Sequence, residues 1–91
     1  MTAFIVGVFE GDIDAWKERF LSDPLGRRQV AKGHTILRSA DNPNQAFVRV
    51  EFDNVEDAKA FAQKVRGSNL LDGLNVTVPP TASELVDKAE Y

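Results

Sequence analysis

The chain has 91 residues, no cysteine and a net charge of −3, with a sequence pI near 5.0. Its length suits one domain, and the lack of cysteine excludes disulfides, thiolate chemistry and cysteine-bound zinc. The acidic balance counts against a nucleic-acid-binding surface, which needs a positive field. A local basic run of Arg27, Arg28 and Lys32, with Lys17 and Arg19 nearby, is the exception. We interpret this run as a solvated helix end and loop.

The first elements that the chain predicts are a strand and a helix. Residues 3–9 form a continuous apolar run rich in β-branched and aromatic residues, which is typical of a strand covered on both faces. Asp12 is a good N-cap, and the helix that follows it must end before Pro24. Trp16 lies on the apolar face of this helix, where we expect it to be a core residue.

The middle of the chain predicts a hairpin. Residues 25–32 are compatible with a further turn or two of helix before the next strand, at residues 34–40. Residues 41–44 are dense in turn formers. In residues 45–52, apolar side chains at every second position alternate with aromatic and charged ones, which indicates a strand with one buried face.

The last third predicts a second helix and a fourth strand. Asn54 is a suitable N-cap, and Asp57 stands where a capping box places an acidic side chain. The helix ends at residues 66–69, where glycine, serine and asparagine follow the apolar stripe. A short strand at residues 74–78 is closed by the two prolines at residues 79–80.

This order of strands and helices predicts an α+β ferredoxin-like βαββαβ sandwich. We expect a four-stranded antiparallel sheet with strand order 4-1-3-2 and both helices on one face. Residues 1–80 form the domain, and residues 81–91 form a C-terminal tail that is either a short helix or an extended arm. The N-terminus carries no basic segment, and its apolar run is too short to span a bilayer, so we expect a cytoplasmic protein with no membrane contact.

The first strand is apolar on both faces, with Phe4, Val6 and Val8 on one side and Ile5 and Phe9 on the other. Two helices cover only one face of such a sheet. Large apolar groups of a central strand are not left in water without reason, so something must cover the second face. We expect either a second copy of the domain or a flat ligand, and a homodimer through the open sheet face is our preferred reading.

The hairpin suggests which side chains share the open face. A turn that sets Ala40 opposite Gln45 also sets His34 opposite Glu51 and Arg38 opposite Phe47. This register gathers polar and apolar side chains on the open face: His34, Arg38, Arg49, Glu51, Ile5, Ile36 and Phe47. An apolar surface with a few convergent polar groups is typical of a ligand cavity.

His34 and Glu51 are our candidate catalytic residues. The imidazole would handle a proton near neutral pH, and the carboxylate would orient it; the alternative is an ordinary cross-strand pair. Arg38 or Arg49 would hold an anionic substrate group, with Phe47 and Ile5 as apolar contacts; the alternative for the arginines is ion pairing at a dimer interface. A single histidine offers no plausible histidine-based metal site, and no nucleotide or nucleophile motif is present, so we expect no metal and no cofactor.

Several segments resemble one family: residues 14–17, 33–34, 37–44, 50–61 and 79–81. They are similar to those of a bacterial branch of the dimeric α+β barrel superfamily, which includes antibiotic-biosynthesis monooxygenase-like and small cyclase-like proteins. The resemblance implies a homodimer whose two sheets face each other, with a pocket in each half. It also implies cofactor-free oxygenation or ring cyclisation as candidate activities.

Two other functions remain open. Residues 46–52, followed by residues 56–58, resemble the third strand and second helix of the RNA-recognition motif, which stacks bases on aromatic side chains. Only Phe47 occupies a useful position for stacking, and the basic residue and glycine of that signature are missing. A non-catalytic ligand-binding or regulatory module on the same fold is the other alternative. Our main hypothesis is a protein that binds a small apolar or aromatic molecule between sheet and partner.

Overall fold

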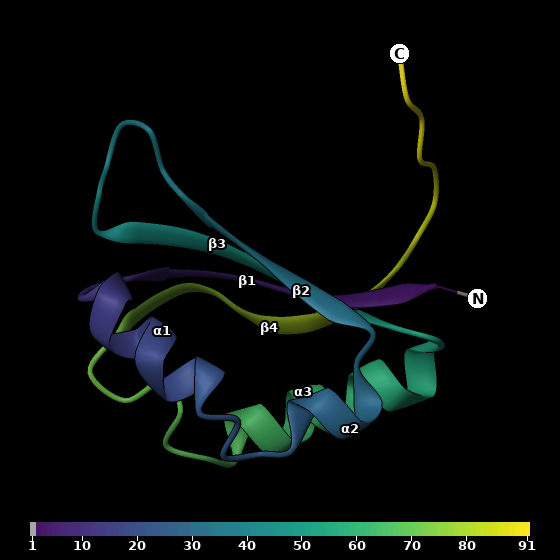
Figure 1. The fold of residues 1–91 in the computed structure, drawn as a ribbon, viewed down its shortest axis with the longest axis horizontal. Helices are drawn as coiled ribbons and strands as arrows, with labels where there is room; N and C mark the ends of the chain where they lie inside the picture. Colours follow the sequence, from purple (N-terminus) through teal and green to yellow (C-terminus); the bar gives the residue numbers. More distant parts are fainter. Residues whose placement is uncertain (1) are drawn as a thin grey trace.

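The computed structural model describes residues 2–91 and has the predicted order of strands and helices (Figure 1), with a short helix where residues 25–32 were compatible with a further turn or two. Its elements are β1 (Ala3–Glu10), α1 (Ile13–Leu21), α2 (Arg27–Val30), β2 (Gly33–Arg38), β3 (Gln45–Phe52), α3 (Val55–Arg66) and β4 (Asn75–Glu84). The four strands form one antiparallel sheet in the order β2-β3-β1-β4, which is the predicted order read from the other edge. None of the helices among residues 2–91 is long and apolar enough to cross a membrane.

The helices lie together on one face of the sheet, and the opposite face is left without a helix (Figure 1). On β3, the side chains alternate as predicted, because Ala46, Val48, Val50 and Phe52 are buried and their neighbours are more exposed. Trp16 is 1% exposed, which confirms that it belongs to the core between the layers. The sheet and its helical cover therefore enclose one apolar core.

Both long helices begin where the sequence predicts. The Asp12 side chain accepts a hydrogen bond from the Ala15 backbone N–H at 3.0 Å. The Asn54 side chain accepts one from the Asp57 N–H at 2.8 Å, and its amide donates to the Asp57 carboxylate at 3.2 Å. These bonds satisfy N–H groups that the first helical turn leaves without partners.

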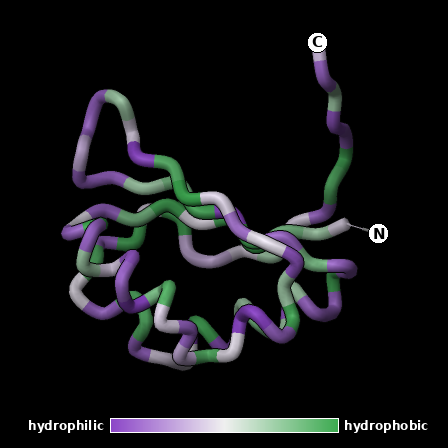
Figure 2. Tube along the Cα trace, in the orientation of Figure 1, coloured by the Kyte–Doolittle hydropathy of each residue, from purple (hydrophilic) through white to green (hydrophobic). Residues whose placement is uncertain are grey.

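The predicted end of the fourth strand is wrong, because β4 runs through Pro79 and Pro80 as far as Glu84. The prolines are tolerated since β4 is an edge strand and the pairing with β1 is irregular there, with register shifts on both sides of Val8. No helix follows within the rest of the chain, so the tail after Glu84 has the extended form. It leaves the domain on the side of the open sheet face (Figure 1), and its first residues are hydrophobic (Figure 2).

The predicted register of the β2–β3 hairpin is wrong by one residue. His34 lies opposite Val50, Arg38 lies opposite Ala46, and Ser39 donates its N–H to the Gln45 carbonyl at 3.0 Å. The Ser39 hydroxyl accepts hydrogen bonds from two backbone N–H groups of the loop, which therefore keeps one more residue than we expected. Because side chains alternate along a strand, this shift moves His34, Ile36 and Arg38 away from the open face.

The predicted faces of β1 are also reversed. Ile5 and Phe9 point toward the helices and are 6% and 3% exposed, whereas Phe4, Val6 and Val8 lie on the open face. Both sets are apolar, so alternation alone offered no choice between them. Gly7 makes room for the Phe9 ring on the helix side, since a Cβ atom at Gly7 would lie 2.9 Å from the Phe9 ring.

Candidate functional site

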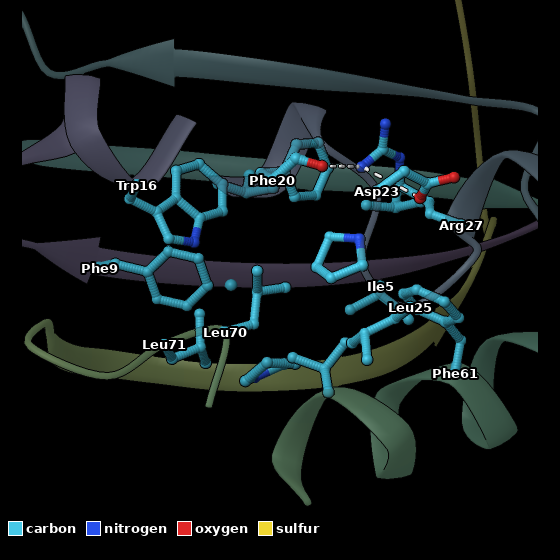
Figure 3. A pocket seen from close by; sticks show the side chains of 16 residues that line it. Ile5, Phe9, Trp16, Phe20, Asp23, Leu25, Arg27, Phe61, Leu70 and Leu71 are labelled. Atoms are coloured by element: carbon cyan, nitrogen blue, oxygen red, sulfur yellow. Dashed lines mark hydrogen bonds and ion pairs between the residues drawn. The ribbon is translucent and has the colours of Figure 1, made fainter. Parts of the chain in front are cut away.

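A small cavity of ≈ 40 Å³ lies between the sheet and the helices (Figure 3). All three helices, the strands β1, β3 and β4, the connection between α1 and α2, and the loop before β4 contribute to its walls. Three aromatic rings form one side of it, with the Trp16 ring centroid 5.5 Å from that of Phe9 and 5.0 Å from that of Phe20. Ile5, Phe61 and other aliphatic side chains complete a mostly apolar lining.

Two buried polar atoms of the lining have no hydrogen-bond partner among residues 2–91. They are the Trp16 indole Nε1 and the Asp23 carboxylate Oδ1. Figure 3 shows the two side chains at opposite ends of the cavity. A buried polar group without a partner costs about 1–3 kcal/mol, so native proteins rarely keep one without a reason. A bound molecule with an acceptor for the indole and a donor for the carboxylate would satisfy both.

Arg27 closes the same end of the cavity as Asp23. Its side chain is 5% exposed, its Nη1 donates to the Phe20 carbonyl at 2.7 Å, and the guanidinium stacks on the Phe20 ring at 3.9 Å. Burial lowers the pKa of the Arg27 guanidinium, and the Asp23 carboxylate, 3.9 Å away, opposes that shift. Our interpretation of Arg27 as part of a solvated loop is therefore wrong. The spacing of four residues from Asp23 to Arg27 was the one sequence signal for this contact.

The cavity is smaller than a drug-sized pocket. One water needs about 10–15 Å³ of such volume, so the space holds a few water-sized groups, far below the roughly 300 Å³ of common ligand pockets. A larger molecule needs the wall to move. The wall formed by the connection between α1 and α2 contains Asp23 and Gly26, whose φ angles of 59° and 72° lie in the left-handed region. Aspartate adopts this conformation more readily than most non-glycine residues do.

The structure does not bring together His34 and Glu51, so the predicted contact between them is wrong. The His34 ring lies on the helix side of β2, edge-on to Phe20 with 5.0 Å between ring centroids, whereas Glu51 projects from the other face of β3. A role for either side chain in proton transfer stays a prediction.

The four predicted substrate-binding residues also separate. Arg38 donates from Nη2 to the Asp14 carboxylate at 2.8 Å and from Nη1 to the Pro43 carbonyl at 3.1 Å, near the end of the hairpin. Ile5 lines the internal cavity. Phe47 and Arg49 are exposed on the open face, as predicted. Sequence reasoning missed Asp23 entirely and assigned Trp16 to the core without a polar role.

The open face carries a shallow hollow of ≈ 280 Å³ that crosses all four strands. Val6 and Val8 lie in it beside Phe47 and Leu37. The Phe47 side chain is 41% exposed and the Leu37 side chain is 57% exposed. Arg49 also lines this hollow, and its guanidinium lies over the Phe4 ring, 5.3 Å from the ring centre. The expected apolar open face is therefore present, with a different set of β1 side chains from the one we expected.

Among solved structures, the chain is similar to a protein from Chloroflexus aurantiacus J-10-fl that is assigned as an antibiotic biosynthesis monooxygenase. The likeness has a TM-score of 0.65 and 13% sequence identity, and it covers 100% of this chain and 97% of the other. No family model and no curated protein matches the sequence. Because the likeness extends over the full length of this chain and nearly all of its neighbour, this protein shares the α+β ferredoxin-like fold of that neighbour, as its order of strands and helices predicted.

Proposed function

We propose that the protein is a homodimer that binds a small aromatic or apolar molecule with one polar group, inside the cavity of each chain. The observation that carries this proposal is a pair of buried polar atoms without a hydrogen bond, Trp16 Nε1 and Asp23 Oδ1, in an otherwise apolar enclosure. The ligand site is thus proposed between sheet and helices, rather than between sheet and partner. A hydroxyl group suits either end of the cavity, because it accepts from an indole and donates to a carboxylate.

The chemistry we propose for this site is cofactor-free oxygenation of an electron-rich aromatic substrate. In such a reaction a CH₂ group of the substrate and O₂ become a carbonyl group and one water, so the substrate supplies the electrons. The chain would contribute an apolar enclosure that excludes water. It would also place the Asp23 carboxylate beside a substrate hydroxyl. A non-catalytic binding module with the same cavity is the second candidate, and oxygen uptake in the presence of a bound substrate separates the two.

Trp16 makes the binding test direct, because it is the only tryptophan of the chain and lines the cavity. We would titrate the protein with phenol and with toluene, which differ by the hydroxyl group, and follow the tryptophan fluorescence. We expect phenol to bind saturably, with a dissociation constant about tenfold lower than that of toluene. Toluene binds more weakly because it leaves the buried polar atoms without a hydrogen bond. Equal response to both compounds, or none to either, would contradict the proposed site.

Two matched variants locate the bound molecule. Leu71→Phe adds bulk to the cavity wall, and we expect it to weaken phenol binding at least severalfold. Leu37→Phe makes the same change on the open face, and we expect no effect on phenol binding. If Leu37→Phe weakens binding instead, the ligand occupies the open face.

The open face supports the homodimer part of the proposal. Its apolar side chains come from all four strands, and two such faces stack about 10 Å apart in sheet-on-sheet packing. Light scattering should therefore report about twice the chain mass of 10.1 kDa. We expect Phe47→Asp to halve that value, and Lys17→Asp on the exposed side of α1 to leave it unchanged. A wild-type protein of single-chain mass at high concentration would refute the dimer.

A further inference from the structure

The basic run that the proposed function leaves unused forms a cleft at the junction of α2 and β2. The cleft has a volume of ≈ 180 Å³ and is lined by Arg27, Arg28, Ala31, Lys32, Gly33 and His34. Its lining contains three cationic side chains and the only imidazole of the chain, and no carboxylate. Nothing lies within 4 Å of the position where Gly33 would carry a Cβ atom, so the space beside Gly33 is open.

The cations of the cleft are incompletely partnered. The buried Arg27 guanidinium has one hydrogen bond, to the Phe20 carbonyl, and an ion pair with Asp23 at the long distance of 3.9 Å. No hydrogen bond or ion pair joins the Arg28 guanidinium to any of residues 2–91. Lys32 lies 3.4 Å from Asp53 and 3.9 Å from Glu51, with all three side chains at least 40% exposed, where such pairs contribute little.

His34 reports the sign of the local field. Its pKa is lowered first by partial burial and then by the positive charges of Arg27 and Arg28, and no carboxylate offsets these effects. The Phe20 ring of α1, which lies edge-on to the imidazole, is uncharged. The cleft is therefore positive at the imidazole, although the protein as a whole carries a net charge of −3.

We propose that this cleft binds a small oxyanion, the phosphate or carboxylate group of a small molecule, at the Arg28 guanidinium, with the positive charge of the buried Arg27 behind it. Guanidinium forks match the geometry of both groups and form two parallel hydrogen bonds with them. Arg27 is held in place by its buried contacts, so its positive charge stays fixed at the wall of the cleft. This site goes beyond the proposed function and does not depend on a ligand in the internal cavity.

The single histidine supplies an unambiguous test. We would follow the His34 ring-proton NMR signals against pH in chloride and in inorganic phosphate at equal ionic strength. We expect phosphate to raise the His34 pKa by about one unit, because a bound anion stabilises the imidazolium, and the effect to saturate with phosphate concentration. The same His34 pKa in both salts would overturn the proposal. A parallel titration with acetate shows whether a carboxylate also binds.

A matched pair of variants separates a site from general charge screening. Arg28→Gln and Lys17→Gln remove one positive charge each from exposed positions, but only Arg28 lines the cleft. We expect Arg28→Gln to weaken phosphate binding about tenfold, the usual loss when a hydrogen bond to a charged group is removed. Lys17→Gln should leave it unchanged. Equal losses in the two variants would show screening alone and would also overturn the proposal, while phenol binding in the internal cavity would be unaffected by either result.

Discussion

The two faces of the sheet differ far more in their cover than in their composition. Phe52 and Phe47 lie on the same strand and point to opposite faces; Phe52 is fully buried, whereas Phe47 is 41% exposed. The helices of the chain itself cover the first face, and nothing within residues 2–91 covers the second (Figure 1). An apolar face therefore shows only that a cover is needed, and the helices within residues 2–91 supply that cover for one face.

The largest effect should come from the covered face. We expect Phe52→Ala to lower the free energy of unfolding by about 3–5 kcal/mol, because it leaves a cavity beside Phe61 in a closely packed core. Urea denaturation followed by circular dichroism measures the loss. A cost below about 1 kcal/mol would mean that the core between sheet and helices is not tightly packed.

The attachment of the helical cover can be weakened without touching the core. Asn54→Ala removes the side chain that caps α3, and we expect it to cost about 1 kcal/mol. Asn54→Gly, which also lacks the cap but is better tolerated at this position, should cost less. If neither variant changes the urea midpoint, α3 is held by its packing on the sheet alone.

The open face should respond differently, and its response should depend on concentration. At protein concentrations low enough to give single chains, we expect Phe47→Ala to cost less than about 1 kcal/mol, because the side chain is already half in water. At high concentration the difference from the wild type should grow, since the wild type gains stability from a second copy. A large cost that is independent of concentration would show that Phe47 is part of a core within one chain.

The smallest effect should come from His34, at the edge of the covered face. Its pKa in the folded chain is lowered from the ordinary value of 6.5, so the unfolded chain takes up the proton first. The stability that neutral His34 contributes is complete above pH 6.5 and is lost as the pH falls through the lower folded-state pKa.

Denaturation of the wild type and of His34→Gln between about pH 7.5 and pH 5 measures this contribution, because no other histidine titrates in that range. The variant should lose less stability than the wild type as the pH is lowered. An equal loss in both proteins would show that the imidazole does not contribute.

Short sequence patterns, such as helix caps and strand alternation, predicted much of the fold. Asp12 and Asn54 cap helices where their side chains predict, and the alternation from Ala46 to Phe52 set the buried face of β3. These features depend on neighbours within a few residues, which a single sequence contains in full. The order of elements then leaves few possible topologies, so the sheet order was predictable as well.

Features that depend on distant contacts were not predictable. Both faces of β1 carry apolar side chains, and packing against the helices determined which of them is buried. The register of β2 against β3 depended on one extra residue in the hairpin loop. Arg27 looked like a surface residue, because its contacts with Phe20 form only when the chain folds α2 back on α1.

By itself, therefore, the sequence determined the elements, their order and the need for a second apolar cover. The tertiary structure alone decided that Ile5 lines a cavity, that Trp16 and Asp23 line it with polar atoms that make no hydrogen bond, and that His34 lies beside arginines instead of Glu51. The physical reason is range: caps and alternation act over one helical turn or one strand, whereas a cavity exists only where several distant elements meet.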